Sequence, residues 1–306
     1  MSTIAILGAG AMGSLWAAQL LLNKACDTLF FVDPRPQRLS SIQFQFTPFS
    51  TTQATSNQLN VPCVSPKESA SPDLLLVCTK SYQALPALTQ TLRHWPTPPA
   101  LLLFQNGMGS QQAILNAWPA LKIYAAISTE GAYRPDAHSL VHAGKGETII
   151  GPMSKTAIAN GPQTIRARLA PSELSLLEEA NIWPRLWRKL VINCAINPFT
   201  ALCRCKNGEV PQQPLFQQLW PDLRQELQQL LRHAGMMLSA EELEELVFGV
   251  IRNTANNRSS MLQDIEAQRP TEIDDINGFA AHTLQQAGLN HQINQQLWES
   301  VRALGH

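Results

Sequence analysis

The sequence lacks the features that mark secreted, metal-binding and nucleic-acid-binding proteins. Its 306 residues include 6 cysteines, none of which forms a Cys-x-x-Cys pair, and its 7 histidines are scattered without metal-ligand spacing. We therefore expect free thiols in a reducing compartment and no metal site. The 23 basic and 23 acidic residues balance, so net charge gives no reason to expect nucleic acid or an acidic membrane as a partner.

Long uninterrupted apolar runs are also missing. Residues 3–22 have the hydropathy of an export signal, but no Lys or Arg precedes them, and Gly8, Gly10 and Gly13 interrupt them. The later runs Leu74–Cys78 and Ala100–Phe104 have the length of strands and are too short to span a bilayer. We expect a cytoplasmic protein, a monomer or homodimer, whose partners are small molecules.

Apolar runs alternate with helical stretches in the N-terminal half, as in βαβ units with a largely parallel sheet. After about residue 172 the sequence is helical and rich in Leu, Gln and Glu, which predicts domains at 1–175 and 176–306. In the second domain, Leu215–Ala234 stops before Gly235, Ser239 and Glu242 form a capping box, and an apolar stripe ends at Gly288. The expected strands are Thr3–Leu7, Thr28–Val32, Leu74–Cys78, Ala100–Phe104, Lys122–Ile127 and Ile149–Ile150, the expected first helix is Ala11–Asn23, and the stripe is Ile273, Ile276, Ala280, Leu284 and Ala287.

A Gly-x-Gly-x-x-Gly motif joins the first strand to the first helix. Gly8 permits a tight turn, Gly10 lets the backbone approach a pyrophosphate, and Gly13 allows close packing of helix and strand. The phosphates would then lie at the helix N-terminus, where free N–H groups favour anions. The fold class is therefore α/β, with an N-terminal Rossmann domain and a C-terminal all-helical domain. The expected cofactor-binding residues of this loop are Gly8, Ala9, Gly10, Ala11, Met12 and Gly13.

The end of the second strand leaves the form of the dinucleotide open. An acidic residue there binds the ribose hydroxyls of NAD(H), and a basic one accepts the 2′-phosphate of NADP(H). Asp33 favours NAD(H), whereas Arg35 and Arg38 can hold a phosphate. Lys80 and Asn106 follow later strands and are expected at the ligand-binding edge of the sheet, or else in a solvated loop and an Asn-Gly turn.

The most informative segment is a helix with a polar stripe. Lys189, Asn193 and Asn197 are spaced i, i+4 and i+8 among apolar residues, so they share one face of a largely buried helix. A polar ligand would satisfy them, and the alternatives are an internal hydrogen-bond network or an exposed stripe. Pro198 is expected to end or kink the helix near Asn197.

A lysine in this position suits the reduction of a ketone. Hydride transfer to the carbonyl carbon places negative charge on the oxygen, and an ammonium group within hydrogen-bond reach stabilises that charge and delivers a proton. Burial would lower the pKa of Lys189 and ease the transfer.

The chain resembles the 2-dehydropantoate 2-reductase (ketopantoate reductase) family over nearly its full length. The resemblance rests most on Arg-Lys189-Leu-x-x-Asn193-x-x-x-Asn197-Pro-x-Thr-Ala with Asn207-Gly-Glu, and on Ser-Ser260-Met-Leu-Gln-Asp followed by Pro-Thr-Glu272-Ile-Asp-x-Ile-Asn-Gly. Further matching blocks are Gly8–Gly13, Cys78–Ser81 and Asn106–Gly109.

The resemblance implies a role for each matching residue. Lys189 matches the proton donor, Ser260 matches a serine that holds the substrate carboxylate, and Glu272 matches a carboxylate beside the lysine and cofactor. From its position in the pattern alone, Glu272 would be a solvated charge. The usual cofactor is NADPH, the reaction yields (R)-pantoate, and the pathway makes pantothenate. The implied substrate-binding residues are Lys189, Asn193, Asn197, Asn207, Asn257, Ser259 and Ser260, and further cofactor contacts are Arg35, Lys80, Asn106, Ala132 and Glu272.

Two other functions remain open. A related NAD-linked hydroxy-acid dehydrogenase would explain Asp33. A dinucleotide-sensing regulatory protein would keep the fold, but it would have no need of a proton donor at Lys189.

Overall fold

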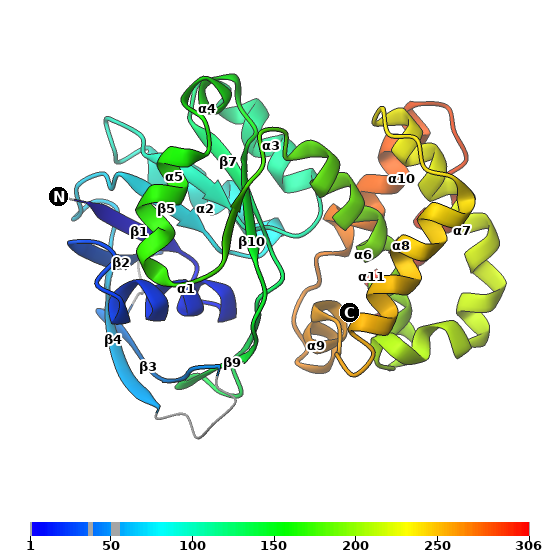
Figure 1. The fold of residues 1–306 in the computed structure, drawn as a ribbon, viewed down its shortest axis with the longest axis horizontal. Helices are drawn as coiled ribbons and strands as arrows, with labels where there is room; N and C mark the ends of the chain where they lie inside the picture. The colour runs from blue at the N-terminus through cyan, green and yellow to red at the C-terminus, as the bar shows by residue number, and fades with distance from the viewer. Residues whose placement is uncertain (1, 36–38, 50–55, 306) are drawn as a thin grey trace. The chain divides into compact units, whose positions relative to one another are not determined.

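The computed structural model describes residues 2–35, 39–49 and 56–305. The chain divides into two compact units (Figure 1). Unit 1 comprises Met1–Gln105 and Gln111–Ile182, and unit 2 comprises Asn106–Ser110 and Trp183–His306. The boundary expected near residue 175 remains a prediction.

Unit 1 contains one mixed sheet, in the order β11-β10-β7-β6-β5-β1-β2-β4-β3-β9-β8. Its centre, from β7 to β4, is parallel, and the strand order reverses beside β1, which pairs with both β2 and β5. Dinucleotides bind at such a reversal, outside the carboxyl ends of the strands. The strands are β1 Thr3–Leu7, β2 Thr28–Val32, β3 Ser41–Thr47, β4 Asn57–Val64, β5 Leu74–Val77, β6 Ala100–Leu103, β7 Ile123–Ser128, β8 Gly131–Tyr133, β9 Ser139–Gly144, β10 Thr148–Pro152 and β11 Leu176–Glu178.

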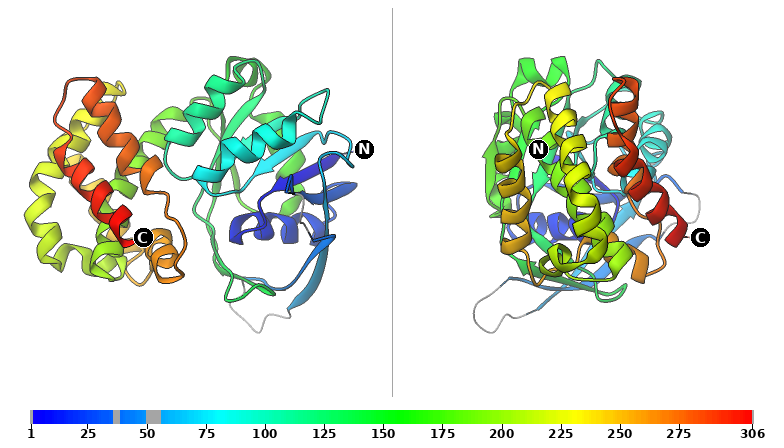
Figure 2. Two further views of the ribbon diagram at one scale, coloured as in Figure 1. Left: turned by 180° about the vertical axis from the view of Figure 1, so that it is seen from behind. Right: turned by 90° about the vertical axis from the view of Figure 1, so that its right-hand side faces the viewer.

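Helices cover both faces of this sheet. Figure 1 shows α1 and α5 in front of the strands, and the view from behind in Figure 2 shows α2 and α3 in front of them. The central strands are apolar throughout because both of their faces are covered. Trp16 of α1 lies in this core with its ring centroid 5.6 Å from that of Phe104. The helices of unit 1 are α1 Ala11–Leu22, α2 Ser81–Leu92, α3 Gly109–Ala117, α4 Lys155–Asn160 and α5 Gln163–Leu169, with the 3₁₀ helix η1 Ala170–Ser172.

Residues 183–305 of unit 2 form helices joined by loops (Figure 2). Helix α6 is central and packs against α7, α8, α9 and α11. The fold class expected from the sequence, a Rossmann domain with a helical domain, is confirmed. The elements are α6 Trp183–Cys203, η2 Asn207–Gln212, α7 Pro214–His233, α8 Ala240–Asn253, α9 Ser260–Glu266, η3 Ile273–Asp275, α10 Asn277–Gln286 and α11 Gln292–Leu304.

Most helix signals in unit 2 are confirmed. Gly235 follows α7 with φ +76°, and the side chains of Ser239 and Glu242 cap the start of α8 reciprocally. The apolar stripe was only partly right, because Ile273 and Ile276 precede α10 instead of lying on it. Both are nonetheless buried, so their hydrophobicity reflects packing and not helical periodicity.

The expectation that Pro198 ends or kinks the helix near Asn197 was wrong in its first part, because α6 continues to Cys203. Proline has no N–H, so it cannot donate to the carbonyl of Cys194 four residues earlier. The side-chain amide of Asn277 donates to that carbonyl at 3.3 Å. This replacement from α10 satisfies the buried acceptor and allows the helix to proceed.

Candidate functional site

The glycine loop of unit 1 has the shape of a phosphate-binding turn. Gly8 has φ +108°, and a Cβ on Gly13 would lie 2.0 Å from the carbonyl oxygen of Gly8, so both positions require glycine. Around Gly10, by contrast, a Cβ would meet nothing within 4 Å. Gly10 is also the N-cap of α1 and provides no side-chain cap for its N–H groups. The loop therefore has an open face at an uncapped helix N-terminus, which fits a pyrophosphate.

The loop after β5 lies against this turn. A Cβ on Gly8 would be 2.6 Å from the backbone nitrogen of Thr79, which precedes Lys80 at the start of α2. Lys80 is therefore one residue from a close contact with the glycine loop, and its role as a cofactor contact remains a prediction. Ala132 lies on β8 and pairs with His142 of β9.

The acidic and basic candidates after β2 bind each other. Arg35 donates to both carboxylate oxygens of Asp33, with Nη2 at 2.6 Å from Oδ2 and Nε at 2.9 Å from Oδ1. These hydrogen bonds, and then the charge of Asp33, raise the pKa of the Arg35 guanidinium. Asp33 is therefore neutralised locally. Arg38 lies outside the described residues.

Unit 2 presents Lys189 from α6 in half-buried surroundings. Loss of solvation lowers the pKa of the Lys189 ammonium, and the negative charge of Glu272 opposes that shift. Asn197 is buried and Asn193 is half-buried on the same helix. Among the residues described, none forms a hydrogen bond with the side chain of Lys189, Asn193 or Asn197. Their polar groups are available to a ligand.

Glu272 is buried, with 5% of its surface exposed, so the sequence pattern that suggested a solvated charge was misleading. Its Oε2 accepts a hydrogen bond of 3.0 Å from the amide of Asn106. Asn106 belongs to the short segment 106–110 of unit 2, whose Met108 N–H donates to the carbonyl of Asp275. Two residues that the sequence separates widely are thus brought together beside the lysine's charge.

The remaining substrate candidates have different surroundings. Asn207 is buried, donates to the hydroxyl of Thr254 at 2.9 Å, and leaves its Oδ1 without a partner. Ser259 caps α9 by accepting from the N–H of Leu262 and also bonds the hydroxyl of Thr200 at 2.6 Å. Asn257 and Ser260 are exposed. Ser259 therefore has a clear structural role, whereas Asn207 retains a free acceptor.

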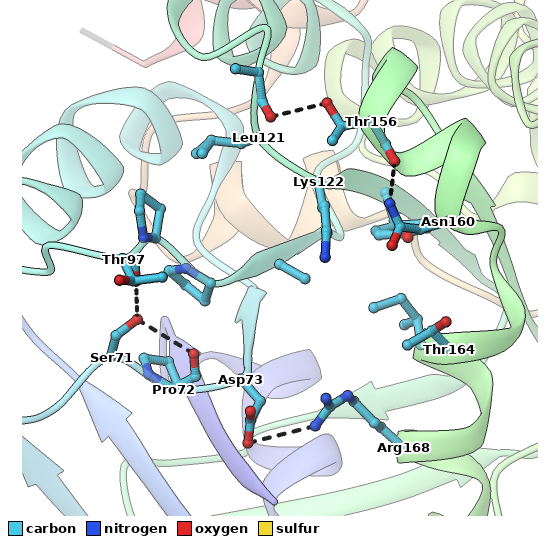
Figure 3. A pocket seen from close by; sticks show the side chains of 16 residues that line it. Ser71, Pro72, Asp73, Thr97, Leu121, Lys122, Thr156, Asn160, Thr164 and Arg168 are labelled. Atoms are coloured by element: carbon cyan, nitrogen blue, oxygen red, sulfur yellow. Dashed lines mark hydrogen bonds and ion pairs between the residues drawn. The ribbon is translucent and has the colours of Figure 1, made fainter.

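Unit 1 also contains a cavity of about 560 Å³ at the opposite edge of its sheet (Figure 3). Asp73, Ala100 and Lys122 border it at the amino ends of β5, β6 and β7. In Figure 3 the amine of Lys122 points into the cavity, while Arg168 turns towards Asp73, with nitrogen and oxygen 3.6 Å apart. Because dinucleotides bind at carboxyl ends of strands, this cavity is a different place from the cofactor loop.

Among the described residues, no group of three or more His, Cys, Asp or Glu side chains could hold a metal ion. No helix among them is long and apolar enough to cross a membrane. The cysteines are free thiols, as expected.

Sequence reasoning missed several polar residues that shape both units. Arg134, in the loop after β8, donates to the carbonyl of Ala9 in the glycine loop. In unit 2, Glu226 accepts from Asn294, which accepts in turn from Asn277. No spacing rule marks these residues, because each bonds a partner distant in sequence.

The mixed sheet of unit 1, with its parallel centre and its strand–glycine loop–helix turn, defines a Rossmann-type nucleotide-binding domain. Sequence models of the family described as "Ketopantoate reductase PanE/ApbA" match residues 4–155, and those of its C-terminal part match residues 181–305. The chain belongs to the ketopantoate reductase family.

Individual relatives extend this match over the whole chain. The 2-dehydropantoate 2-reductase of Vibrio cholerae is 32% identical over 304 residues, covering 98% of this chain and 97% of the relative. The enzyme of the same name from Escherichia coli O157:H7 is 33% identical over 300 residues, covering 98% and 94%. The enzyme from Archaeoglobus fulgidus is 30% identical over 302 residues, covering 98% and 97%.

Solved structures share the fold. A PanE/ApbA family ketopantoate reductase from Ralstonia eutropha JMP134 superposes with a TM-score of 0.83 at 23% identity, covering 99% of this chain and 98% of the other. A D-mandelate dehydrogenase, solved with NADH and anilino(oxo)acetate, superposes with a TM-score of 0.86 at 22% identity and the same coverage.

Proposed function

We propose that this protein reduces 2-dehydropantoate to (R)-pantoate with NADPH, as a cytoplasmic enzyme of pantothenate biosynthesis. The observation that carries the proposal is Lys189: an ammonium group with a lowered pKa on a helix that also presents Asn193 and Asn197, whose side chains bond no other described residue. The names of the relatives support the choice of substrate.

Unit 1 supplies the residues for the cofactor. The open face at Gly10 and the uncapped N-terminus of α1 suit the pyrophosphate, with Ala9, Ala11 and Met12 completing the turn. Arg35 is the candidate for the 2′-phosphate of NADPH, and Lys80 and Ala132 are further contacts. When bound, the reduced nicotinamide supplies the hydride to C2 of the keto acid.

Unit 2 supplies the residues for the substrate and the proton. Lys189 donates a hydrogen bond to the ketone oxygen, stabilises the negative charge that hydride addition places there, and transfers its proton to give the hydroxyl. Asn193, Asn197 and Asn207 hold the polar groups of the substrate, and Ser260 of the Asn257–Ser260 stretch takes the carboxylate. Glu272 keeps the lysine protonated by countering the effect of its desolvation.

The test is a variant without the amine. Lys189→Ala should lower kcat by about 100-fold or more, the range for loss of one acid and its electrostatic stabilisation, while NADPH binding stays nearly unchanged. Arg185→Ala, on the same helix, is a matched control for removal of a basic side chain. Near-normal turnover of Lys189→Ala would remove this lysine from the mechanism.

A second function is a related dehydrogenase that acts on another 2-keto acid with NADH. Asp33 at the end of β2 favours it, and the D-mandelate dehydrogenase of similar fold was solved with NADH. Initial rates with NADPH and NADH over a panel of 2-keto acids separate the two. A clear NADH preference without turnover of 2-dehydropantoate would favour the dehydrogenase, and NADPH binding without any oxidation would indicate a sensor.

A further inference from the structure

Arg134 reaches from the loop after β8 to a backbone carbonyl of the glycine loop. Its Nη1 donates to the carbonyl of Ala9 at 2.8 Å and to the hydroxyl of Ser14 at 3.3 Å. The hydroxyl of Ser14 also donates to the Ala9 carbonyl, at 3.2 Å. The other terminal nitrogen of Arg134 donates to the carbonyl of Ala137. One guanidinium thus fixes the peptide between Ala9 and Gly10 through its carbonyl oxygen.

This cation is held in place at a cost. Arg134 is half-buried, and loss of solvation lowers the pKa of its guanidinium against the opposing charge of Asp136. The guanidinium lies 5.8 Å from the centre of the Phe44 ring. Within the described part of the chain no carboxylate lies within ion-pair distance of the guanidinium, and Asp136 accepts instead from the N–H of His138 and the hydroxyl of Ser139. Asp136 therefore acts on the guanidinium only at longer range, and no carboxylate pairs directly with Arg134 beside the loop.

The bonded peptide is the one that matters for an anion. The carbonyl of Ala9 and the N–H of Gly10 belong to the same peptide group, and Gly10 borders the open face of the loop. A cation on the carbonyl polarises the group and strengthens its N–H as a donor. It also holds the peptide plane in one orientation, so less order has to be gained on binding.

We propose that Arg134 is a positioning residue of the dinucleotide site, which presents the Gly10 N–H to the diphosphate bridge of the cofactor and offsets its charge. This rests on the proposed function, because it requires that the glycine loop bind a dinucleotide. Arg134 acts through the loop and on the diphosphate, and it has no part in binding the adenosine 2′-phosphate.

Two ligands, used as probes, separate the contribution of the diphosphate bridge to binding from that of the 2′-phosphate. NADPH contains the bridge, whereas adenosine 2′-monophosphate keeps the base and the 2′-phosphate but lacks it. Arg134→Ala should weaken NADPH binding in calorimetry by about 10- to 100-fold, as for loss of hydrogen bonds from a charged group, and leave adenosine 2′-monophosphate unchanged. The KM for NADPH should rise in parallel while kcat at saturating NADPH is retained. Arg134→Lys keeps the positive charge but lacks the forked guanidinium, so its NADPH affinity should lie between those of the wild type and Arg134→Ala.

The controls separate this role from simple stability. Arg93→Ala, an exposed arginine after α2, should bind both probes as the wild type does. Equal losses of both probes by Arg134→Ala, together with a lowered melting temperature, would show a merely structural arginine and overturn the inference. Unchanged NADPH binding by Arg134→Ala would overturn it as well. Failure of the wild-type protein to bind NADPH at all would instead overturn the proposed function, and this inference with it.

Discussion

Asp33 and Arg35 form a bidentate ion pair directly after β2. At this position Rossmann domains distinguish NAD(H) from NADP(H). The pair explains why the sequence offers both signs of charge at one place. Arg35 neutralises a carboxylate that would repel a 2′-phosphate, and the carboxylate holds the guanidinium in position. Arg35 is 77% exposed, so the pair is open to a ligand.

The first prediction follows from this pair. Arg35→Ala leaves Asp33 unbalanced and should lower kcat/KM for NADPH by about 10- to 100-fold while changing that for NADH little. Asp33→Ala frees the guanidinium and should raise the ratio of NADPH to NADH efficiency. Steady-state kinetics with both cofactors measures the ratio, with Arg93→Ala as the matched control. Equal losses with both cofactors in Arg35→Ala would place the pair away from the 2′-phosphate.

Two glycines of the same loop should respond differently to alanine. Gly10→Ala meets open space and has an ordinary φ of −72°, so the protein should fold normally but bind NADPH at least about 10-fold more weakly, because the methyl group occupies the phosphate face. Gly13→Ala drives a Cβ into the Gly8 carbonyl and should lower the melting temperature. Calorimetric titration and thermal unfolding of both variants test the contrast. Normal NADPH affinity of Gly10→Ala would show that no phosphate lies there.

The pH dependence of reduction should report Lys189. In the proposed mechanism the protonated amine is the donor, so kcat/KM for the keto acid should fall as pH rises through the lysine pKa, which burial sets below the ordinary 10.5. Glu272→Gln removes the charge that raises this pKa, yet its amide oxygen can still accept from Asn106. The alkaline fall should therefore move to lower pH.

Rate profiles between pH 6 and 11 would show this shift. Exposed Glu299→Gln should leave the profile unchanged. A fall that stays in place or moves to higher pH in Glu272→Gln would contradict the assigned coupling between the carboxylate and the lysine.

The proline inside α6 allows a double-mutant cycle. Asn277→Ala leaves the carbonyl of Cys194 without a donor and should cost about 1–3 kcal/mol of stability. Pro198→Ala restores an N–H for that carbonyl, so the cost of Asn277→Ala should be smaller in this background. Urea unfolding of the four proteins gives the coupling. Additive losses would mean that Asn277 stabilises the fold only through Asn294.

Local patterns in the sequence predicted the elements that depend on local chemistry. Strands β1 and β2, the turn at Gly8 and the capping box at Ser239 follow from apolar runs, glycine geometry and reciprocal capping. Strand β3 was missed, although Phe44 and Phe46 are buried between exposed glutamines in a clear alternation. Its alternation of Gln and Phe differs from the continuous apolar runs by which the central strands were recognised.

The positions of the candidate site residues could be predicted where helical spacing determines them. They could not be predicted where contacts between distant parts of the chain determine them. Lys189, Asn193 and Asn197 could be placed on one face from their spacing alone. The burial of Glu272 could not be predicted from local spacing, because it depends on a partner, Asn106, from a distant part of the chain. The continuation of α6 past Pro198 depends in the same way on a donor from another helix.

The segment 106–110 limits where the protein can be divided into fragments that fold on their own. It belongs to unit 2, although the chain on both sides of it belongs to unit 1. A Cβ on Gly107 would lie 2.1 Å from the carbonyl of Asp275, so only a glycine fits this close backbone contact. Expressing residues 183–306 alone would leave Glu272 and Asp275 without these neighbours. A faithful isolated helical fragment would have to include a grafted Asn106–Ser110 peptide, and a simple cut at residue 182 would not yield a self-sufficient module.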